Sequence, residues 1–367
     1  MAKSKILFLI NNLKVGGAEN VFTGQFLYFK KRGLEVKMAV LSDDQFYQNN
    51  RDRILIGQND LFFINWQGLA DLSAYFRLLG YIRTNKINYV YATLDKANLV
   101  APLLKLFLPA LKIIKRESGM ADRKSRKIKL SDRIFNFLCH KVIAVSEEVK
   151  ASLVEYQPEH RNKIVVLENG VAVELGEEEV KAVINQKDHK ILKILNVGSM
   201  NNDNKGQIGL VELVKRLKQK GIDCLLYLAG GGKLKSEIEK KATIEGIEDK
   251  VKFTGVINQK ELKYHYLGSN LFILNSSNEG CPNVVLEAMS YGLLVAASQV
   301  GGVKNMIEDG VSGFIFKHND LNRLEEIVSS VINNPGLAKK IAYQGYLRVK
   351  EKFLFQNKCE ELLAFFE

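Results

Sequence analysis

Residues Asn278–Gly292, NEGCPNVVLEAMSYG, follow the apolar run Leu271–Leu274 and are typical of a strand, a tight turn and a helix in succession. Gly280 and Pro282 favour the turn, and Asn283 is suited to be the N-cap of the helix. A short apolar run followed by a glycine-bearing turn and a helix is the repeating unit of parallel α/β proteins. This stretch therefore predicts a parallel sheet with functional loops at the carboxyl ends of its strands.

The same alternation continues along the whole chain. In the first half it predicts strands at Lys5–Ile10, Glu35–Leu41, Tyr89–Ala92, Lys112–Lys115, Val142–Val145 and Ile164–Leu167. In the second half it predicts strands at Ile191–Val197, Cys224–Ala229, Val251–Thr254, Leu271–Leu274, Leu294–Ala297 and Phe314–Phe316. Each half opens with a strand, a glycine-bearing loop and a helix. We therefore expect an α/β protein of two Rossmann-like, doubly wound domains facing each other across a cleft, with ligands at the strand ends.

Length and composition agree with two globular domains. A chain of 367 residues exceeds one ordinary core, and it is 46% hydrophobic with only 5 prolines. Its four cysteines are scattered without a CxxC pair, which favours a reducing compartment and argues against disulfides or a zinc site. The apolar run near the start is too short for an export signal. The segment 98–114 is short and interrupted for a membrane span, so no transmembrane helix is expected.

The chain is strongly basic, with a formal net charge of +12. The densest segment, Lys112–Arg133, has nine Lys and Arg residues against three acids. Nucleic acid, an anionic membrane surface or a phosphorylated substrate would each suit such a segment, and so would a plain solvated face. The segment contains no aromatic residue. This argues against nucleic acid, because aromatic side chains usually accompany the basic ones at such interfaces.

Two carboxylates flank the start of the helix in the opening stretch. The N–H groups of a helix start are suited to hold phosphate or sugar oxygens. Glu279 precedes them and can accept hydrogen bonds from sugar hydroxyls, whereas Glu287 lies one turn on and can hold vicinal hydroxyls such as those of a ribose. Simple capping with a surface glutamate explains the same spacing, which does not decide between the two interpretations.

The stretch EGCPNVVLEAMSYG, with the later LVAASQVGGVKNMIEDGVSGFIF, resembles the nucleotide-binding half of retaining glycosyltransferases of family 4. Five further segments match that family in order: LKVGGAEN, VIAVSEEVK, KIVVLENGV, ILNVGSMNNDNKGQ and YLAGGGKLKSEIEKKATIEGIEDKVKFTGVI. The resemblance covers essentially the whole chain. It implies the GT-B fold and transfer of a sugar from a nucleotide-sugar, expected to be a UDP-sugar, with retention of configuration and without a cofactor.

The resemblance also implies a division of labour along the chain. Residues 1–171 are expected to bind the acceptor, and residues 191–345 to bind the nucleotide-sugar. The charged segment 172–190 is expected to connect them, and a C-terminal helix at 346–367 to cross back to the first domain.

The family pattern assigns a donor site to this chain: Gly17, Ser199, Lys205, Glu279, Gly280, Cys281, Pro282, Asn283, Val284 and Glu287. Lys205 and Glu279 are the expected catalytic residues, with Lys205 neutralising the leaving diphosphate. The family usually has an arginine where this chain has Ser199, so half of the usual basic clamp is missing. On the acceptor side the resemblance points to Gly16, Arg116 and Glu117 as positioning residues.

The implied mechanism needs neither a protein base nor a metal. Many relatives have a histidine in the segment where this chain has Glu117 and Ser118. In front-side attack the leaving phosphate takes the acceptor proton, and the protein contributes electrostatic stabilisation. No D-x-D motif occurs in the chain. Such a motif would hold a divalent cation, so we expect a metal-free diphosphate site.

Three alternatives remain beside a transferase acting on a glycan or polyprenyl-linked acceptor in bacterial surface polysaccharide or lipopolysaccharide assembly. They are a transferase with a soluble acceptor, a sugar-nucleotide epimerase or phosphorylase of the same architecture, and a non-enzymatic basic protein that binds nucleic acid or membrane. With a lipid-linked acceptor, we expect a cytoplasmic protein held peripherally on the inner face of the plasma membrane. The sugar, the linkage, the nucleotide base, the acceptor and the oligomeric state are left open by the sequence.

Overall fold

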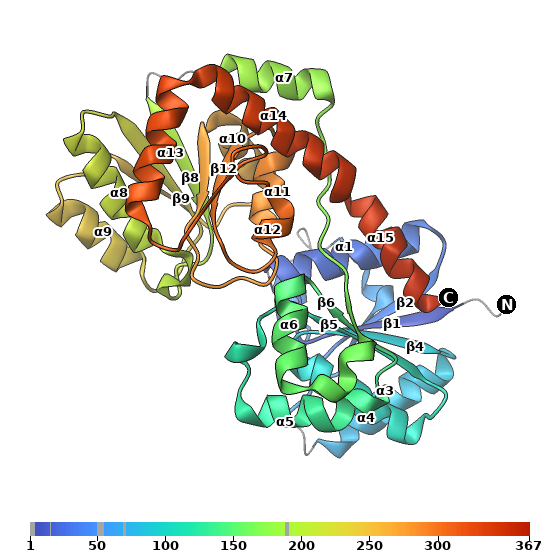
Figure 1. Ribbon diagram of the computed structural model, residues 1–367. Coiled ribbons are helices and arrows are strands. Elements are labelled where there is room, and N and C mark those ends of the chain that lie inside the picture. The colour runs from blue at the N-terminus through green and yellow to red at the C-terminus, as the bar shows by residue number, and fades with distance from the viewer. Residues whose placement is uncertain (1–3, 15, 50–54, 69–70, 188–190) are drawn as a thin grey trace. The chain divides into compact units, whose positions relative to one another are not determined.

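The computed structural model describes residues 4–367 except 15, 50–54, 69–70 and 188–190 (Figure 1). The chain divides into two compact units. The first comprises Met1–Gly170 together with Phe355–Glu367, and the second comprises Val171–Leu354.

The first unit is built on a seven-stranded parallel sheet in the order β3-β2-β1-β4-β5-β6-β7. Its strands are β1 (Lys5–Ile10), β2 (Glu35–Val40), β3 (Leu61–Phe63), β4 (Tyr89–Thr93), β5 (Lys112–Glu117), β6 (Lys141–Ala144) and β7 (Ile164–Val166). Its helices are α1 (Gly17–Lys31), α2 (Gln45–Asn49), α3 (Leu72–Thr84), α4 (Asp95–Phe107), α5 (Arg126–Phe135), α6 (Glu147–Tyr156) and α15 (Phe355–Leu363).

The second unit repeats this plan with a six-stranded parallel sheet in the order β10-β9-β8-β11-β12-β13. Its strands are β8 (Leu192–Val197), β9 (Cys224–Ala229), β10 (Val251–Gly255), β11 (Leu271–Leu274), β12 (Leu294–Ser298) and β13 (Phe314–Phe316). Its helices are α7 (Glu177–Gln186), α8 (Gln207–Gln219), α9 (Lys235–Ile244), α10 (Gln259–Gly268), α11 (Asn283–Ser290), α12 (Val303–Met306), α13 (Leu321–Asn333) and α14 (Pro335–Lys352).

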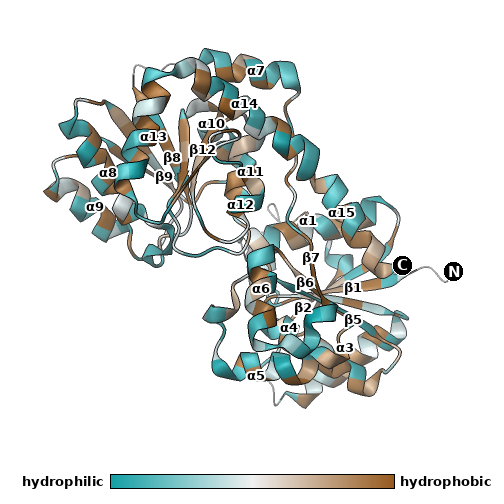
Figure 2. Ribbon diagram, in the orientation of Figure 1, coloured by the Kyte–Doolittle hydropathy of each residue, from teal (hydrophilic) through white to brown (hydrophobic). Residues whose placement is uncertain are grey.

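Both units are doubly wound in the Rossmann order, which confirms the predicted fold class. Figure 2 shows hydrophobic strands within each unit and helices with hydrophilic residues on their outer faces. In the first unit the core is strongly aromatic. Phe22, Phe26 and Phe29 follow one another at helical spacing on α1, and all three rings pack edge-on or tilted around Phe8 of β1.

Two short elements were not expected from the sequence. Strand β3 has only three residues, too few to show a clear alternation. Helix α7 lies inside the segment 172–190, which was expected to connect the domains and for which no helix was predicted. Its Val180 and Ile184 are buried one turn apart in the core of the second unit, and Tyr343 of α14 hydrogen-bonds Glu177 at 3.3 Å. Because α7 contains many charged residues, this narrow apolar face was not recognised in the sequence.

The C-terminal helix expected at 346–367 is two helices. Helix α14 ends at Lys352 in the second unit, and α15 begins at Phe355 in the first. Phe366 packs edge-on against Phe29 at 5.8 Å between ring centroids and against Tyr91 at 5.7 Å. The end of the chain thereby completes the core of the first unit.

The basic segment 112–133 does not form one solvated face. Lys115, Glu117, Lys124 and Asp132 form a buried cluster of two positive and two negative side chains. Lys115 and Lys124 lie 2.6 and 2.7 Å from the carboxylate of Asp132, and the Tyr156 hydroxyl donates to it at 3.0 Å. Much of the charge in this segment is therefore internal and compensated. No helix among the described residues is long and apolar enough to cross a bilayer.

Replacing Asp132 by Asn should destabilise the first unit. Burial raises the pKa of Asp132, but Lys115 and Lys124 outweigh that effect and lower it to about 2. We expect a loss of about 3–5 kcal/mol at pH 7, because two buried ammonium groups lose a partner. A lowered pKa stabilises the fold above about pH 4, and that contribution is lost as the pH falls toward 2. The difference between wild type and variant should therefore shrink in acid.

The measurement is urea unfolding followed by the fluorescence of Trp66, the only tryptophan of the chain, which reports on the first unit. Asp122→Asn is the matched control, because Asp122 is exposed in the loop after β5. It should change stability by less than about 0.5 kcal/mol. Equal destabilisation by both variants would show that the buried cluster contributes nothing specific.

Candidate functional site

The loops at the carboxyl ends of the second sheet come together around Asn275, the first residue after β11. Its side-chain amide donates to the Gly206 carbonyl at 3.0 Å and to Asn319 Oδ1 at 2.7 Å. Its Oδ1 accepts the Asn319 N–H at 2.9 Å, and its backbone carbonyl contacts His318 Nδ1 at 2.9 Å. Asn275 is fully buried and ties the loops after β8, β11 and β13 to one another. The sequence analysis missed Asn275, His318 and Asn319.

Lys205 and Glu279 are brought together at this edge. Lys205 precedes α8 and its ammonium contacts Glu279 Oε1. The same oxygen accepts the Ser276 hydroxyl at 2.7 Å. Gly198 lets the lysine stem lie across the loop, since a Cβ there would lie 3.0 Å from Lys205 Cγ. Both charged side chains remain partly exposed, at 24% and 16%. They therefore form a neutral pair that a ligand can reach.

Helix α11 starts next to Glu279. Its N-cap is Pro282 and not Asn283, so the expected capping by Asn283 was wrong: Asn283 is already the first helical residue. The Pro282 side chain has no acceptor atom, and no side-chain cap bond is formed at this helix start. Cys281, Asn283 and Val284 are half-buried here, and Cys281 forms no disulfide. Backbone N–H groups at such a start suit an anion or a sugar oxygen.

The loop after β12 lies directly against the loop that carries Glu279. The Gly302 N–H donates to the Gly280 carbonyl at 3.0 Å. Gly301 has a φ of 46°, and a Cβ at this position would lie 2.3 Å from the Glu279 carbonyl oxygen. Only glycine permits this approach, so Gly301 helps to fix the position of Glu279.

Glu287 lies on the second turn of α11, where its Oε2 accepts the Tyr266 hydroxyl at 2.9 Å. Burial raises the pKa of Glu287, and the hydrogen bond from Tyr266 opposes that rise. The Tyr266 ring is stacked on Tyr291 at 5.6 Å. The carboxylate is thus held in place with one oxygen occupied. Ser199 is exposed on the loop after β8, and its Oγ accepts the Asn201 N–H at 3.3 Å.

The expected residues of the first unit lie in a separate set of contacts. Gly17 begins α1 and Gly16 is its N-cap, with Glu19 so close that a Cβ on Gly16 would meet its Oε2 at 2.3 Å. Val15 lies outside the described residues. Arg116 is 2% exposed and donates to Asn169 Oδ1. Its Nη1 is buried without a hydrogen-bond partner among the described residues, so the positioning role of Arg116 stays a prediction.

Glu117 is also buried, in contact with Lys115 and Lys124 of the ionic cluster. Its environment is that of a structural carboxylate. Among the described residues, no three His, Cys, Asp or Glu side chains gather as they would around a metal ion. The absence of a metal from the reaction stays a prediction.

Two doubly wound, Rossmann-like units in one chain are the architecture of the GT-B fold. The family model Glycosyltransferase Family 4 matches residues 15–175, and the model Glycosyl transferases group 1 matches residues 177–348. The chain belongs to this family of glycosyltransferases.

Known glycosyltransferases are similar to the whole chain or to part of it. The capsular polysaccharide biosynthesis glycosyltransferase CapM of Staphylococcus aureus is 23% identical over 387 residues, covering 99% of this chain and 96% of CapM. The amylovoran biosynthesis glycosyltransferase AmsK of Erwinia amylovora is 32% identical over 147 residues, covering 38% and 36%. The crystal structure of HepE from Anabaena in complex with UDP has the same fold, with a TM-score of 0.81, 19% identity and 98% coverage of both chains. The relatives favour a glycosyltransferase over the epimerase and the non-enzymatic alternatives.

Gly301→Ala should destabilise the second unit more than Gly310→Ala. Both glycines have a positive φ, at 46° and 73°, but nothing lies within 4 Å of a Cβ at Gly310. The left-handed backbone alone costs an alanine roughly 1–2 kcal/mol. The clash with the Glu279 carbonyl should add about 1–3 kcal/mol at Gly301 only. Urea unfolding followed by far-UV circular dichroism gives the loss of unfolding free energy for each variant. Equal losses would mean that the loops of Gly301 and Glu279 can move apart without an energetic cost.

Proposed function

We propose that this chain is a retaining glycosyltransferase that moves a hexosyl or N-acetylhexosaminyl group from a UDP-sugar to a glycan or polyprenyl-linked acceptor in bacterial surface polysaccharide or lipopolysaccharide assembly. The observation that carries the proposal is the Lys205–Glu279 pair at the open start of α11. CapM and AmsK are named for polysaccharide biosynthesis, and HepE was also solved with UDP-glucose. These names support the donor and the pathway class.

Lys205 is the group that would neutralise the leaving diphosphate. Without a ligand its charge is balanced by Glu279, and a bound diphosphate offers the ammonium a second, doubly charged partner. Contact with the phosphate would free part of the Glu279 carboxylate for a hydroxyl of the transferred sugar. Because Ser199 stands in place of the usual arginine, Lys205 and the N–H groups at the start of α11 would stabilise the negative charge of the leaving diphosphate.

In the proposed reaction the acceptor hydroxyl attacks the anomeric carbon on the face from which the phosphate departs. The bond from this carbon to the phosphate oxygen breaks, and the new glycosidic bond forms on the same side. The departing phosphate oxygen takes the proton of the acceptor hydroxyl, so the products are the glycoside and UDP. The protein supplies orientation and charge stabilisation, and no side chain needs to act as a base.

The test is a screen of UDP-, GDP- and dTDP-sugars for donor hydrolysis and for transfer to extracted lipid-linked glycans. We expect a UDP-sugar to be used, the product to keep the anomeric configuration of the donor by NMR, and turnover to persist in excess EDTA. A product of inverted configuration would refute the retaining mechanism. Loss of turnover in EDTA, restored by magnesium or manganese, would refute the metal-free site.

Glu287→Ala and Glu279→Ala should have different effects. Ribose hydroxyls bind alike in ground and transition states, so we expect Glu287→Ala to weaken UDP binding about tenfold or more. Contacts to the reacting sugar strengthen as charge develops, so Glu279→Ala should lower kcat by about 10²-fold or more with a smaller change in UDP affinity.

Calorimetric titration with UDP and steady-state kinetics separate these two effects. Glu248→Ala is the control, since Glu248 is an exposed glutamate of the same unit. Wild-type values for both site variants would remove the site assignment.

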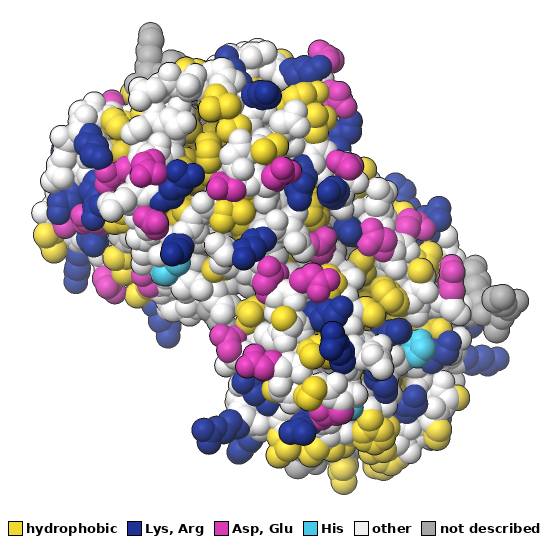
Figure 3. Space-filling model, in the orientation of Figure 1, with side chains coloured by type: hydrophobic (Ala, Val, Ile, Leu, Met, Phe, Trp, Pro, Cys, Tyr) yellow, Lys and Arg dark blue, Asp and Glu magenta, His cyan; other side chains and the backbone are white. Residues whose placement is uncertain are grey.

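The proposal includes peripheral binding to the anionic inner face of the plasma membrane, where a lipid-linked acceptor would be found. Helices α4 and α5 of the first unit present exposed apolar side chains beside basic ones (Figure 3). These apolar residues are Leu106, Phe107, Leu130, Ile134 and the nearby Phe137, between 48% and 59% exposed. Arg126, Lys127 and Arg133 are exposed on α5. Such a mixture of apolar and basic groups fits an anionic lipid surface.

Arg126→Glu combined with Lys127→Glu should release the protein from acidic vesicles. Each basic residue near the surface contributes on the order of 1 kcal/mol, so the double reversal should weaken binding at least about tenfold in low salt. Lys124 is unsuitable for this test because it belongs to the buried cluster. Cosedimentation with phosphatidylglycerol vesicles at low and high salt gives the result.

Lys218→Glu combined with Lys220→Glu is the control, with equal charge change on α8 and its C-cap in the second unit. If the α5 variant binds acidic vesicles as well as the wild type does, the proposed membrane-binding surface is refuted. Donor hydrolysis should be unchanged in every variant.

A further inference from the structure

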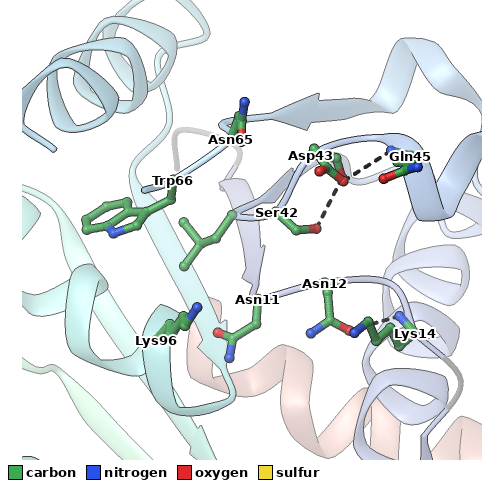
Figure 4. A pocket seen from close by; sticks show the side chains of 10 residues that line it. Asn11, Asn12, Lys14, Ser42, Asp43, Gln45, Asn65, Trp66 and Lys96 are labelled. Carbon is green, nitrogen blue, oxygen red and sulfur yellow. Dashed lines mark hydrogen bonds between the residues drawn. The ribbon is translucent and has the colours of Figure 1, made fainter. Parts of the chain in front are cut away.

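A pocket of about 570 Å³ lies at the carboxyl ends of β1, β2 and β3 in the first unit. All residues of its lining belong to the first unit, whereas Lys205 and Glu279 belong to the second. Its lining combines amide and hydroxyl side chains with an aromatic ring and two lysines (Figure 4). The residues that matter here are Asn12, Ser42, Asn65, Trp66, Lys14 and Lys96.

Trp66 is held firmly at the edge of this pocket. Its backbone N–H donates to the Leu41 carbonyl at 2.7 Å, which extends the pairing beyond β3. Its ring meets that of the buried Tyr75 edge-on, with 4.6 Å between ring centroids. The preceding Asn65 adopts a φ of 51°, which turns the chain here and which asparagine tolerates better than most residues. The indole is therefore a fixed, half-buried apolar surface with polar side chains around it.

The two lysines are placed by the loops on which they lie. Asn11 Oδ1 accepts the Ala97 N–H at 2.8 Å, which fixes the start of α4 beside the loop after β1. Lys96 is the residue just before Ala97. Lys14 follows Asn12, whose Oδ1 accepts the Lys14 N–H at 3.0 Å. In the view of Figure 4, Lys96 lies below Trp66 at one end of the pocket and Lys14 lies at the other.

The charge of the pocket favours an anion. Neither Lys14 nor Lys96 lies within ion-pair distance of a carboxylate in the part of the chain that the structure describes. The one carboxylate of the lining, Asp43, accepts the Gln45 N–H at 3.2 Å within its own loop. Two uncompensated ammonium groups thus face the pocket against one carboxylate that already has a backbone partner.

We propose that this pocket binds the acceptor as a saccharide that carries an anionic group, either a carboxylate or a phosphate. The face of a sugar ring would lie on Trp66, and its hydroxyls would hydrogen-bond the amides and Ser42. The anionic group would contact Lys96, with Lys14 available to a second charge further along the acceptor. The assignment of this ligand as the acceptor rests on the proposed function, whereas the binding itself does not.

The position of Trp66 supplies a direct test, because it is the only tryptophan in the chain. Selective excitation of tryptophan therefore reports on this pocket. We would titrate the full-length protein with glucuronic acid, glucose 1-phosphate and neutral glucose. Both acidic sugars should change the emission saturably, with at least about tenfold higher affinity than glucose. The relative response to the two acids distinguishes a carboxylate from a phosphate ligand.

Lys96→Ala should weaken the binding of both acidic sugars at least about tenfold and leave the binding of glucose unchanged. Lys96→Arg should keep much of the affinity for the acidic sugars. Lys31→Ala removes the same charge from the exposed end of α1 and should behave as wild type. Trp66→Ala should weaken the binding of every sugar, as measured by calorimetry.

Equal affinity for acidic and neutral sugars, equal binding by Lys96→Ala and wild type, or no response to any sugar would each overturn the proposal. These results leave donor hydrolysis in the second unit untouched. Conversely, selective binding of acidic sugars by a protein that hydrolyses no nucleotide-sugar would support the pocket and refute the proposed function.

Discussion

The side-chain amide of Asn275 is the interaction on which the arrangement of the second unit's site depends. Parallel strands end at one edge of a sheet, but their loops need a further constraint to meet there. A buried amide can satisfy several backbone groups at once, and leaving any of them unpaired costs free energy. Asn275 does this for Gly206 and Asn319. The loops that carry Lys205 and Glu279 are therefore fixed by a residue that itself stays out of solvent.

In the proposed donor site, this constraint orders the loops although only half of the basic clamp expected from the family pattern is present. Lys205 is anchored by its neighbour Gly206 and faces Glu279, whose own loop is held by Ser276 and by the approach of Gly301. A mutual Lys–Glu contact keeps both side chains near their working positions at little electrostatic cost, because the pair is partly exposed and neutral. In the proposed binding of a diphosphate by Lys205, pre-organisation of this kind would offset part of the entropy that a mobile lysine loses.

Apart from β3, the strands of both units could be predicted from their apolar runs, and the segments between those runs were long enough for helices. The burial of charged side chains could not be predicted in this way. Nothing in the sequence distinguishes Lys115 and Lys124 from exposed lysines, because their contacts with Asp132 form only when β5 and α5 pack together. Asn275 was missed for a similar reason: a single asparagine after a strand carries no pattern, and its partners are 69 and 44 residues away. Sequence periodicity records which face is apolar, whereas polar networks are set by tertiary proximity.

The placement of Phe366 has a consequence for biosynthesis. The Ser4 hydroxyl donates to the Phe366 carbonyl at 2.5 Å, and the Phe366 ring fills the space between Phe29 and Tyr91. On the ribosome the second unit, a continuous segment, can close as soon as it has emerged. The first unit begins earlier but cannot complete its aromatic core before Phe366 has been made, which happens after the whole second unit. The nascent chain therefore carries the first unit without this part of its core while the second unit is synthesised.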